Sequence, residues 1–243
     1  MTSPIVESAH GSIPERTYER LRDLIIRGRI PAGARVVEAE VALQFGVSRT
    51  PVREALARLI HERYLVPTST GRRTQLVVAH FTSDDVRELW GIIGALESYA
   101  VARVTALSEP KRTVIADDLR ELNLDLKAES QSRPRDPDKL FELQTAFHLR
   151  FVYETAGSHL RSIYDAVRPQ VQRYEWIYGT RSESQYQPST NEHMRIIAAI
   201  RLGDAAAAQA SVVSHWRKAA VRTAKVIEEL SRQPRRKLRT SFR

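Results

Sequence analysis

Apolar residues recur every three or four positions along several stretches of the chain, and this spacing predicts helices. The clearest case begins at Val52, because positions 52, 55, 56, 59 and 60 are all apolar. Gly46 ends the preceding helix, since glycine reaches the left-handed conformation that a tight turn needs. Ser48 is placed to cap the new helix, and Pro51 falls in its first turn, where a missing N–H costs nothing.

The polar side of this short helix carries Arg49, Thr50 and Arg53 near its N-terminal end. A helix that offers two arginines and a hydroxyl from its first turns suits the major groove of DNA. The helix alone leaves a second interpretation open, in which it is an ordinary surface helix that carries arginines.

Two further helices are predicted upstream. The first begins at a capping box, Ser12 to Glu15, and ends near Gly28. A turn over residues 30–33 leads to a second, short helix from Glu38 to Phe45. The arginine-bearing helix is therefore the third of a compact set.

Two short strands are predicted downstream, at residues 64–66 and 75–78. The hairpin between them carries Gly71, Arg72 and Arg73 at or near its tip. Three helices and a basic hairpin make a winged helix-turn-helix, and the wing arginines would reach phosphate or the minor groove.

Residues 14–80 resemble the DNA-binding domain of the GntR family of bacterial transcriptional regulators. The resemblance lies in the segments 31–38 (PAGARVVE) and 43–56 (LQFGVSRTPVREAL) and in Gly71. It implies that the helix and the wing contact an operator. The predicted DNA-binding set is Arg35, Ser48, Arg49, Thr50, Arg53, Gly71, Arg72 and Arg73.

From Phe81 onward the sequence is helical almost throughout, and it predicts an antiparallel all-α bundle. The predicted helices are Asp84–Leu107, Pro110–Glu129, Pro137–Thr155, Ser158–Gly179, Thr190–Leu202 and Asp204–Leu230. This part resembles the FCD effector-binding domain of the FadR subfamily, in its VanR-like branch. The fold class is therefore mainly α, with a winged domain followed by an FCD-like bundle.

The FCD resemblance implies a divalent metal site. Many FCD domains hold a metal with an aspartate and a histidine one helical turn apart and two later histidines. His148, His193 and His215 match the three histidines, and Gln144 stands at the aspartate position. Three imidazoles suit Zn²⁺ or Ni²⁺, whereas the uncharged amide of Gln144 should weaken binding. A polar pocket whose histidines bind a ligand directly is the alternative.

The effector pocket departs from the family pattern in a second place. FCD domains commonly place an arginine four residues before a glutamate, to pair with an effector carboxylate. Glu97 is retained here, but the arginine position holds Ile93. A carboxylate effector would then need the metal or another arginine, and the candidates are Arg150, Arg168 and Arg173. An uncharged or more hydrophobic effector is the alternative, and nearby Gly91 and Gly94 either widen the pocket or allow close helix packing.

Composition and charge agree with two domains between basic ends. The net charge is +9, and residues 232–243 carry six basic and no acidic side chains. The predicted organisation is an arm at 1–13, the winged domain at 14–80, the helical domain at 81–231 and a basic tail at 232–243. The chain has no cysteine and shows neither a secretory signal nor an apolar run long enough for a membrane span. We therefore expect a soluble, cytoplasmic protein without a membrane partner.

These features together predict a transcriptional regulator that responds to a small-molecule effector and is not an enzyme. A homodimer would place two winged domains on a palindromic operator in double-stranded DNA, and repression is the expected mode. Two alternatives come from other classes. One is a metal-dependent hydrolase that uses the three histidines, and the other is a module whose metal is purely structural.

Overall fold

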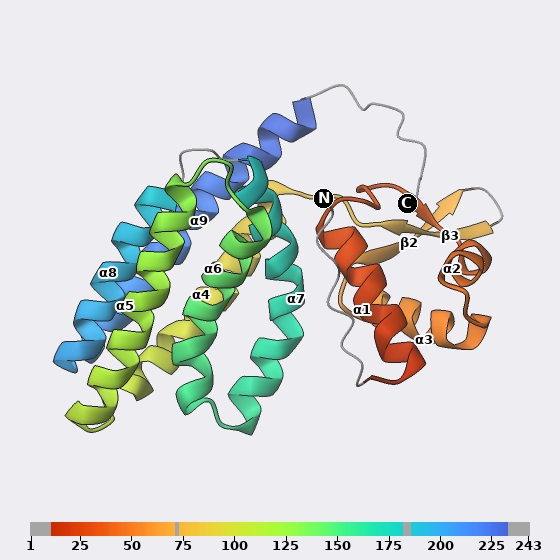
Figure 1. Cartoon of the computed structure of the whole chain (residues 1–243). Coiled ribbons are helices and arrows are strands. Elements are labelled where there is room, and N and C mark those ends of the chain that lie inside the picture. The colour runs from red at the N-terminus through yellow and green to blue at the C-terminus, as the bar shows by residue number, and fades with distance from the viewer. Residues whose placement is uncertain (1–10, 71–72, 182–185, 233–243) are drawn as a thin grey trace. The chain divides into compact units, whose positions relative to one another are not determined.

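The computed structural model describes residues 11–70, 73–181 and 186–232. The chain forms two compact units and passes from one to the other between His80 and Phe81. In these ranges it has nine helices and three strands (Figure 1). No helix in the described ranges is long and apolar enough to span a membrane.

The first unit, here called the winged unit, has three helices and a small sheet. Its elements are α1 (Ile13–Ile26), β1 (Arg35–Val36), α2 (Glu38–Phe45), α3 (Arg49–His61), β2 (Leu65–Thr70) and β3 (Arg73–Val78). The three strands are antiparallel in the order β1-β3-β2, and β2 and β3 pair from Leu65 opposite Val78 to Thr70 opposite Arg73. The sequence predicted the three helices and the hairpin but missed the two-residue strand β1.

Local signals explain the helix ends in the winged unit. The backbone N–H of Glu15 donates to the Ser12 hydroxyl at 3.4 Å, which caps α1. Gly46 ends α2 with a left-handed φ of 66°. Ser48 holds the N-cap position of α3, as predicted, but its side chain makes no capping bond. A cap often bonds the N–H three residues on, and here that residue is Pro51, which has none.

The apolar stripe of α3 is buried as the spacing predicted. Val52, Ala55, Leu56 and Leu59 are buried, and Ile60 at the end of the stripe is half-buried. α3 packs against α1. The opposite side of α3 therefore faces solvent, and this is the side that carries the arginines.

The second unit, here called the helical unit, is a six-helix bundle. Its helices are α4 (Ser83–Thr105), α5 (Glu109–Gln131), α6 (Pro137–Thr155), α7 (Ser158–Arg181), α8 (Tyr186–Leu202) and α9 (Ala205–Arg232). All six predicted helices are present, but α8 begins at Tyr186 instead of Thr190. The added first turn of α8 contains Pro188, and proline is tolerated at this end of a helix.

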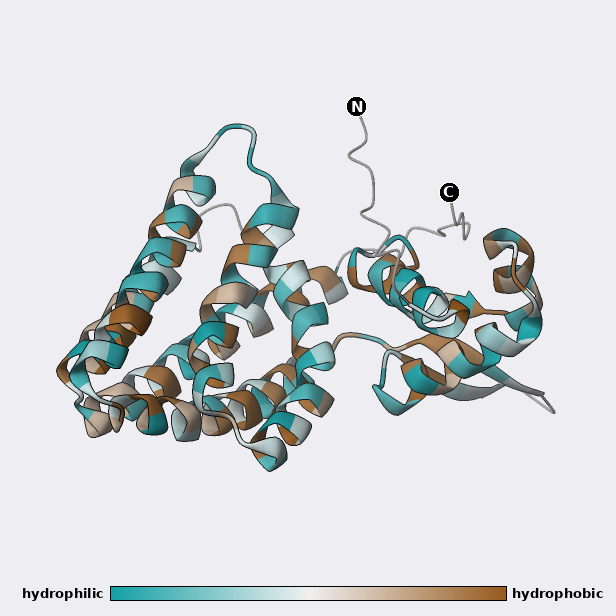
Figure 2. Cartoon of the chain, turned by 60° about the horizontal axis from the view of Figure 1, so that its bottom comes forward, coloured by the Kyte–Doolittle hydropathy of each residue, from teal (hydrophilic) through white to brown (hydrophobic). Residues whose placement is uncertain are grey.

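α4 is the central helix of this bundle and packs against α6, α7, α8 and α9. Figure 2 shows apolar residues gathered on the sides of the helices that face one another. α4 and α9 approach closely at Gly94, where an added Cβ would lie 3.1 Å from Cβ of Trp216. Gly94 therefore serves close helix packing within the chain, which was one of its two predicted roles.

Candidate functional site

The first two turns of α3 present the predicted DNA-binding side chains to solvent. Ser48, Arg49, Thr50 and Arg53 are all exposed, and they share the side of α3 opposite the buried stripe. The arrangement is that of a helix able to place two guanidinium groups and a hydroxyl against base edges.

Arg53 is held by an acidic partner that the sequence did not reveal. Its Nε and Nη2 donate to the two carboxylate oxygens of Glu38, at 3.3 and 3.2 Å. The hydrogen bonds and the charge of Glu38 raise the pKa of Arg53 above its ordinary value. The side chain of Arg53 is still 73% exposed, so the fork of donors is oriented while it stays accessible.

The structure describes only some of the other predicted DNA contacts. Arg35 is exposed on β1. Gly71 and Arg72 lie outside the described residues, and so does the side chain of Arg73, at the start of β3. Most of the predicted arm and most of the predicted tail also fall outside the described ranges.

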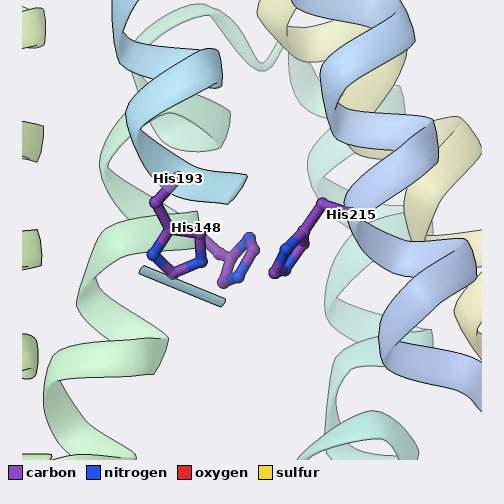
Figure 3. Close-up of side chains that lie close together, drawn as sticks. All are labelled: His148, His193 and His215. Carbon is purple, nitrogen blue, oxygen red and sulfur yellow. The ribbon is translucent and has the colours of Figure 1, made fainter. Parts of the chain in front are cut away.

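Three histidines from three helices of the bundle meet in its interior. His148 lies on α6, His193 on α8 and His215 on α9. They are 0%, 0% and 1% exposed, and each offers a ring nitrogen within 4.8 Å of the others. Figure 3 shows the three rings pointing toward one another.

Hydrogen bonds fix the orientation of all three rings through Nδ1. The pairs are His148 with Oε2 of Glu97 at 2.8 Å, His193 with Oδ1 of Asn123 at 3.0 Å, and His215 with Oε2 of Glu192 at 2.9 Å. A carboxylate only accepts, and the Asn123 amide nitrogen is used to donate to the carbonyl of Thr190. Each Nδ1 is therefore the donor, and each neutral ring keeps its lone pair on Nε2.

Nε2 is the second nitrogen of each ring, and it is the one that the Nδ1 hydrogen bonds leave for a ligand. The Nε2 atoms of His193 and His215 are buried and have no hydrogen-bond partner in the described structure. Nε2 of His148 lies 3.1 Å from Nε2 of Gln144, one helical turn earlier, whose Oε1 is also buried without a partner. An amide can present either end, so turning it would aim an oxygen at the same point.

Electrostatics favours the neutral form of His193 and His215 and the ionised form of Glu192. Burial lowers the pKa of His193 well below its usual value, and its two histidine neighbours lower it further. Burial also lowers the pKa of His215. Burial acts to raise the pKa of Glu192, but hydrogen bonds from His215 and Arg222 outweigh it and bring the value to about 2.

Glu97 is a buried hydrogen-bond acceptor beside the histidines. It orients His148, and it also accepts from Tyr164 at 2.9 Å and from Nε1 of Trp216 at 2.7 Å. Burial acts to raise the pKa of Glu97, but its interaction with His148 and the hydrogen bonds from His148 and Trp216 lower it. Glu97 and Glu192 are both fully engaged, so neither is free as the base that a hydrolytic metal site needs.

A cavity of about 30 Å³ lies beside the histidines. Its lining consists of Trp90, Phe141, Gln144, Glu175, Tyr178, Tyr186, Ser189, His215, Trp216, Ala219 and Thr223. Five of these side chains are aromatic, and none in this set is an arginine or lysine. The sequence missed the aromatic members because they come from five helices that only the fold brings together.

The predicted effector residues do not line this cavity. Ile93 is fully buried in the apolar core. The three arginine candidates are also absent from the lining of the cavity, and each of them is held by another group. Arg150 pairs with Asp118 at 2.8 Å and Glu154 at 2.7 Å, Arg168 pairs with Glu175 at 2.7 Å, and Arg173 lies 4.0 Å above the ring of Phe81.

The donor set fits a divalent ion. Two unpartnered imidazole lone pairs, a third ring beside them and a buried amide oxygen are ligands typical of Zn²⁺ or Ni²⁺ sites. The partners at Nδ1 are also those that fix ligating histidines in metal proteins. Both units thus agree with the resemblances found in the sequence. The winged unit has the exposed arginines on α3, and the helical unit has the three histidines and Glu97.

Comparison with known proteins decides the family. Residues 14–74 match the model of bacterial regulatory proteins of the gntR family, and residues 88–218 match the FCD domain. The chain belongs to the GntR family. It is a DNA-binding transcriptional regulator with an FCD domain, which confirms the predicted family, fold class and function class. GntR regulators bind DNA and small-molecule effectors, and FCD domains often bind a metal.

Relatives and solved structures agree with this assignment. The HTH-type transcriptional regulator YdhC of Bacillus subtilis is 25% identical over 87% of this chain and 91% of its own length. The gluconate operon transcriptional repressor of the same species is 26% identical over 79% of this chain and 76% of its own. Escherichia coli McbR/YncC superimposes with a TM-score of 0.67 at 18% identity, covering 91% of this chain and all of its own, which shows a shared fold.

Proposed function

We propose that the regulator is a homodimeric repressor that acts in the cytoplasm on a palindromic operator. Two copies of the winged unit, residues 14–80, would face two half-sites, because two-fold symmetry in the protein is matched by symmetry in the DNA. A relative that covers most of the chain is a repressor, that of the gluconate operon in Bacillus subtilis. The fact that this relative is a repressor supports repression by the present chain.

Arg49 and Arg53 would read base edges, with Ser48 and Thr50 beside them at the start of α3. Arg35 and the wing residues Gly71, Arg72 and Arg73 would contact phosphate or the minor groove. The exposure of the α3 side chains supports this division.

The helical unit, residues 81–231, would hold a divalent ion of the zinc or nickel type with His148, His193 and His215. Gln144 would add its amide oxygen as a fourth ligand. The observation that carries this proposal is the set of Nε2 lone pairs that converge while every Nδ1 is tied to an acceptor. The ion would supply a Lewis-acidic centre for an effector that controls operator binding.

Effector control needs no more than a difference in affinity. An effector that binds one arrangement of the two winged units better than another shifts the population toward it. Residues of the cavity wall would then set which effector is recognised.

The test is elemental analysis of the full chain, purified without chelator, together with operator binding on the same samples. We expect close to one Zn²⁺ or Ni²⁺ per chain, and loss of the ion in His193→Ala. His159→Ala, a change of an exposed histidine on α7, is the matched control and should keep the ion. A wild-type chain that stays metal-free after Zn²⁺ and Ni²⁺ are added would overturn the metal part and leave the DNA-binding part intact.

A further inference from the structure

Buried polar atoms without partners gather on the wall of the 30 Å³ cavity. They are Nε1 of Trp90, Oε1 of Gln144, Oε1 of Glu175 and Nε2 of His215. Folded proteins rarely leave such atoms unpaired, because each loses its bonds to water without replacement. A metal ion would take the lone pairs of His215 and Gln144. Oε1 of Glu175 remains as an acceptor that the ion does not explain.

Glu175 is a buried carboxylate with one free oxygen. Its side chain is 8% exposed, and Oε2 accepts from Nη1 of Arg168 at 2.7 Å. Arg168 is itself held by the hydroxyl of Thr145 at 3.2 Å, so the guanidinium stays on one side of the carboxylate. The other oxygen, Oε1, is buried without a hydrogen-bond partner, and Glu175 is one of the residues that line the cavity, so this oxygen needs a donor.

The wall around this oxygen is aromatic. Tyr178 and Tyr186 stand as one tilted ring pair, with centroids 6.4 Å apart, and Trp90 and Trp216 as a nearly perpendicular pair at 5.7 Å. Phe141 completes the lining rings. Aromatic faces attract a cation through the ring quadrupole, and cages of such rings are used to bind ammonium groups.

Charge and size favour the same ligand chemistry. The residues that line the cavity include a carboxylate and no arginine or lysine, so a simple carboxylate would meet a like charge at this end. A volume of about 30 Å³ has room for about two water molecules, which is enough for a compact head group. A hydroxyl could satisfy Glu175, but it would leave the five aromatic rings without a function.

We infer that this end of the cavity binds a protonated amine. The ammonium group donates to Oε1 of Glu175 and lies against the aromatic wall, while the histidine end of the same cavity is left to the metal. The inference rests on the proposed effector site and names the chemistry of its ligand. The effector of this regulator is then an amine-bearing molecule, and a plain carboxylate is a poor ligand.

The first experiment compares three small probes of similar size on the zinc-loaded full chain: ethylamine, ethanol and acetate. Binding is followed by tryptophan fluorescence, since Trp90 and Trp216 belong to the wall. We expect saturable binding of ethylamine, which is protonated at neutral pH, and much weaker binding of ethanol and acetate. Acetate binding as tightly as ethylamine, or no saturable binding of ethylamine, overturns the inference.

Variants then locate the amine. Glu175→Gln keeps the shape but removes the charge, and should weaken ethylamine binding by at least about tenfold. Glu154→Gln is the matched control, because Glu154 also pairs with an arginine at 2.7 Å but lies outside the cavity wall. An ethylamine affinity in Glu175→Gln equal to that of the wild type contradicts the inference.

A second variant covers the case in which Glu175→Gln fails to fold with Arg168 left unpaired. Phe141→Leu keeps an apolar wall but removes a ring, and should weaken ethylamine binding about tenfold. Tyr99→Leu, which removes an exposed ring on α4, is its control. Unchanged ethylamine binding in Phe141→Leu overturns the inference. Metal content and operator binding are measured on every sample, so a chain that keeps both but binds no amine refutes only this inference.

Discussion

At the scale of single residues, the pairing of Arg53 with Glu38 is the contact that bears most directly on DNA binding. Two parallel hydrogen bonds hold the guanidinium plane in one orientation while most of the side chain stays in solvent. Recognition of guanine uses the same fork of donors. Glu38 therefore acts as a positioning residue that also competes with DNA for the arginine.

Arg53→Ala should relax base preference. A good bidentate base contact discriminates by about 1–3 kcal/mol, so the ratio of operator to random-sequence affinity should fall by about tenfold or more. Fluorescence anisotropy with both DNAs at several salt concentrations measures this ratio. Arg35→Ala should instead weaken both affinities and lower the salt slope by about one. Arg120→Ala, on the exposed face of α5, is the control, and an unchanged ratio in Arg53→Ala would remove Arg53 from base recognition.

Glu38→Gln should separate affinity from specificity. Removal of a negative charge beside Arg53 should raise binding to random DNA, because the protein then attracts phosphate more strongly. The freed guanidinium loses its fixed orientation, so the operator-to-random ratio should fall. The same anisotropy titrations report both quantities. A fall in both affinities with a constant ratio would show that Glu38 only stabilises the winged unit.

At the scale of helices, the α4–α9 pair depends on one glycine and not on its neighbour. An added Cβ at Gly94 would lie 3.1 Å from Cβ of Trp216, whereas nothing lies within 4 Å of one at Gly91. Trp216 cannot yield easily, because its Nε1 donates to the buried Glu97 at 2.7 Å. The two glycines therefore form a natural pair for a test.

Gly94→Ala and Gly91→Ala should shift stability in opposite directions. Overpacking against Trp216 should lower the free energy of unfolding by about 1–3 kcal/mol in Gly94→Ala. Gly91→Ala fills open space on a helix and should raise it by about 0.5–1 kcal/mol. Urea unfolding followed by circular dichroism gives both values. A destabilised Gly91→Ala variant would indicate that this face is covered by another chain, and the oligomeric state would then be measured.

Elements could be predicted from the sequence where the signal is local. The apolar stripe of α3 and the left-handed Gly46 fixed the helix-turn-helix, and the spacing of apolar residues gave all six helices of the bundle. The first turn of α8 was missed, because proline is common both in loops and in the first turn of a helix, so Pro188 did not distinguish the two.

The candidate site also contains residues that could be predicted from the sequence and residues that could not. The three histidines were found because a family pattern records their positions. Asn123 and Glu192 were missed, because each bonds a histidine that is remote in the sequence. Asn123 bonds His193, and Glu192 bonds His215 although His193 is its neighbour in the chain. The arginines proposed for the effector pocket have partners that the sequence did not reveal: carboxylates pair with Arg150 and Arg168, and Arg173 lies above the ring of Phe81.

At the scale of the whole molecule, the residues proposed for DNA contact and those proposed for ligand binding lie in two separate units. The winged unit carries the exposed arginines, and the helical unit carries the histidines and the cavity. A ligand that binds only the folded helical unit must stabilise that unit by mass action.

Zinc should therefore stabilise one unit selectively. At a free Zn²⁺ concentration 100 times the dissociation constant, the helical unit should gain about 2.7 kcal/mol. Differential scanning calorimetry with and without chelator should show one transition moving and the other fixed. His193→Ala should abolish the shift, and His159→Ala should keep it. Equal movement of both transitions would show that the two units unfold as one.

The hydrogen bonds around the histidines have a consequence for how this regulator can diversify. Glu97, Asn123, Tyr164 and Glu192, with the rings they hold, bring side chains from all six helices of the bundle into the polar centre. A substitution there disturbs several helices at once, so few changes are tolerated. New ligand preferences in descendants of this chain should therefore arise by exchange of the aromatic wall, and libraries built to alter its response should be aimed at the same positions.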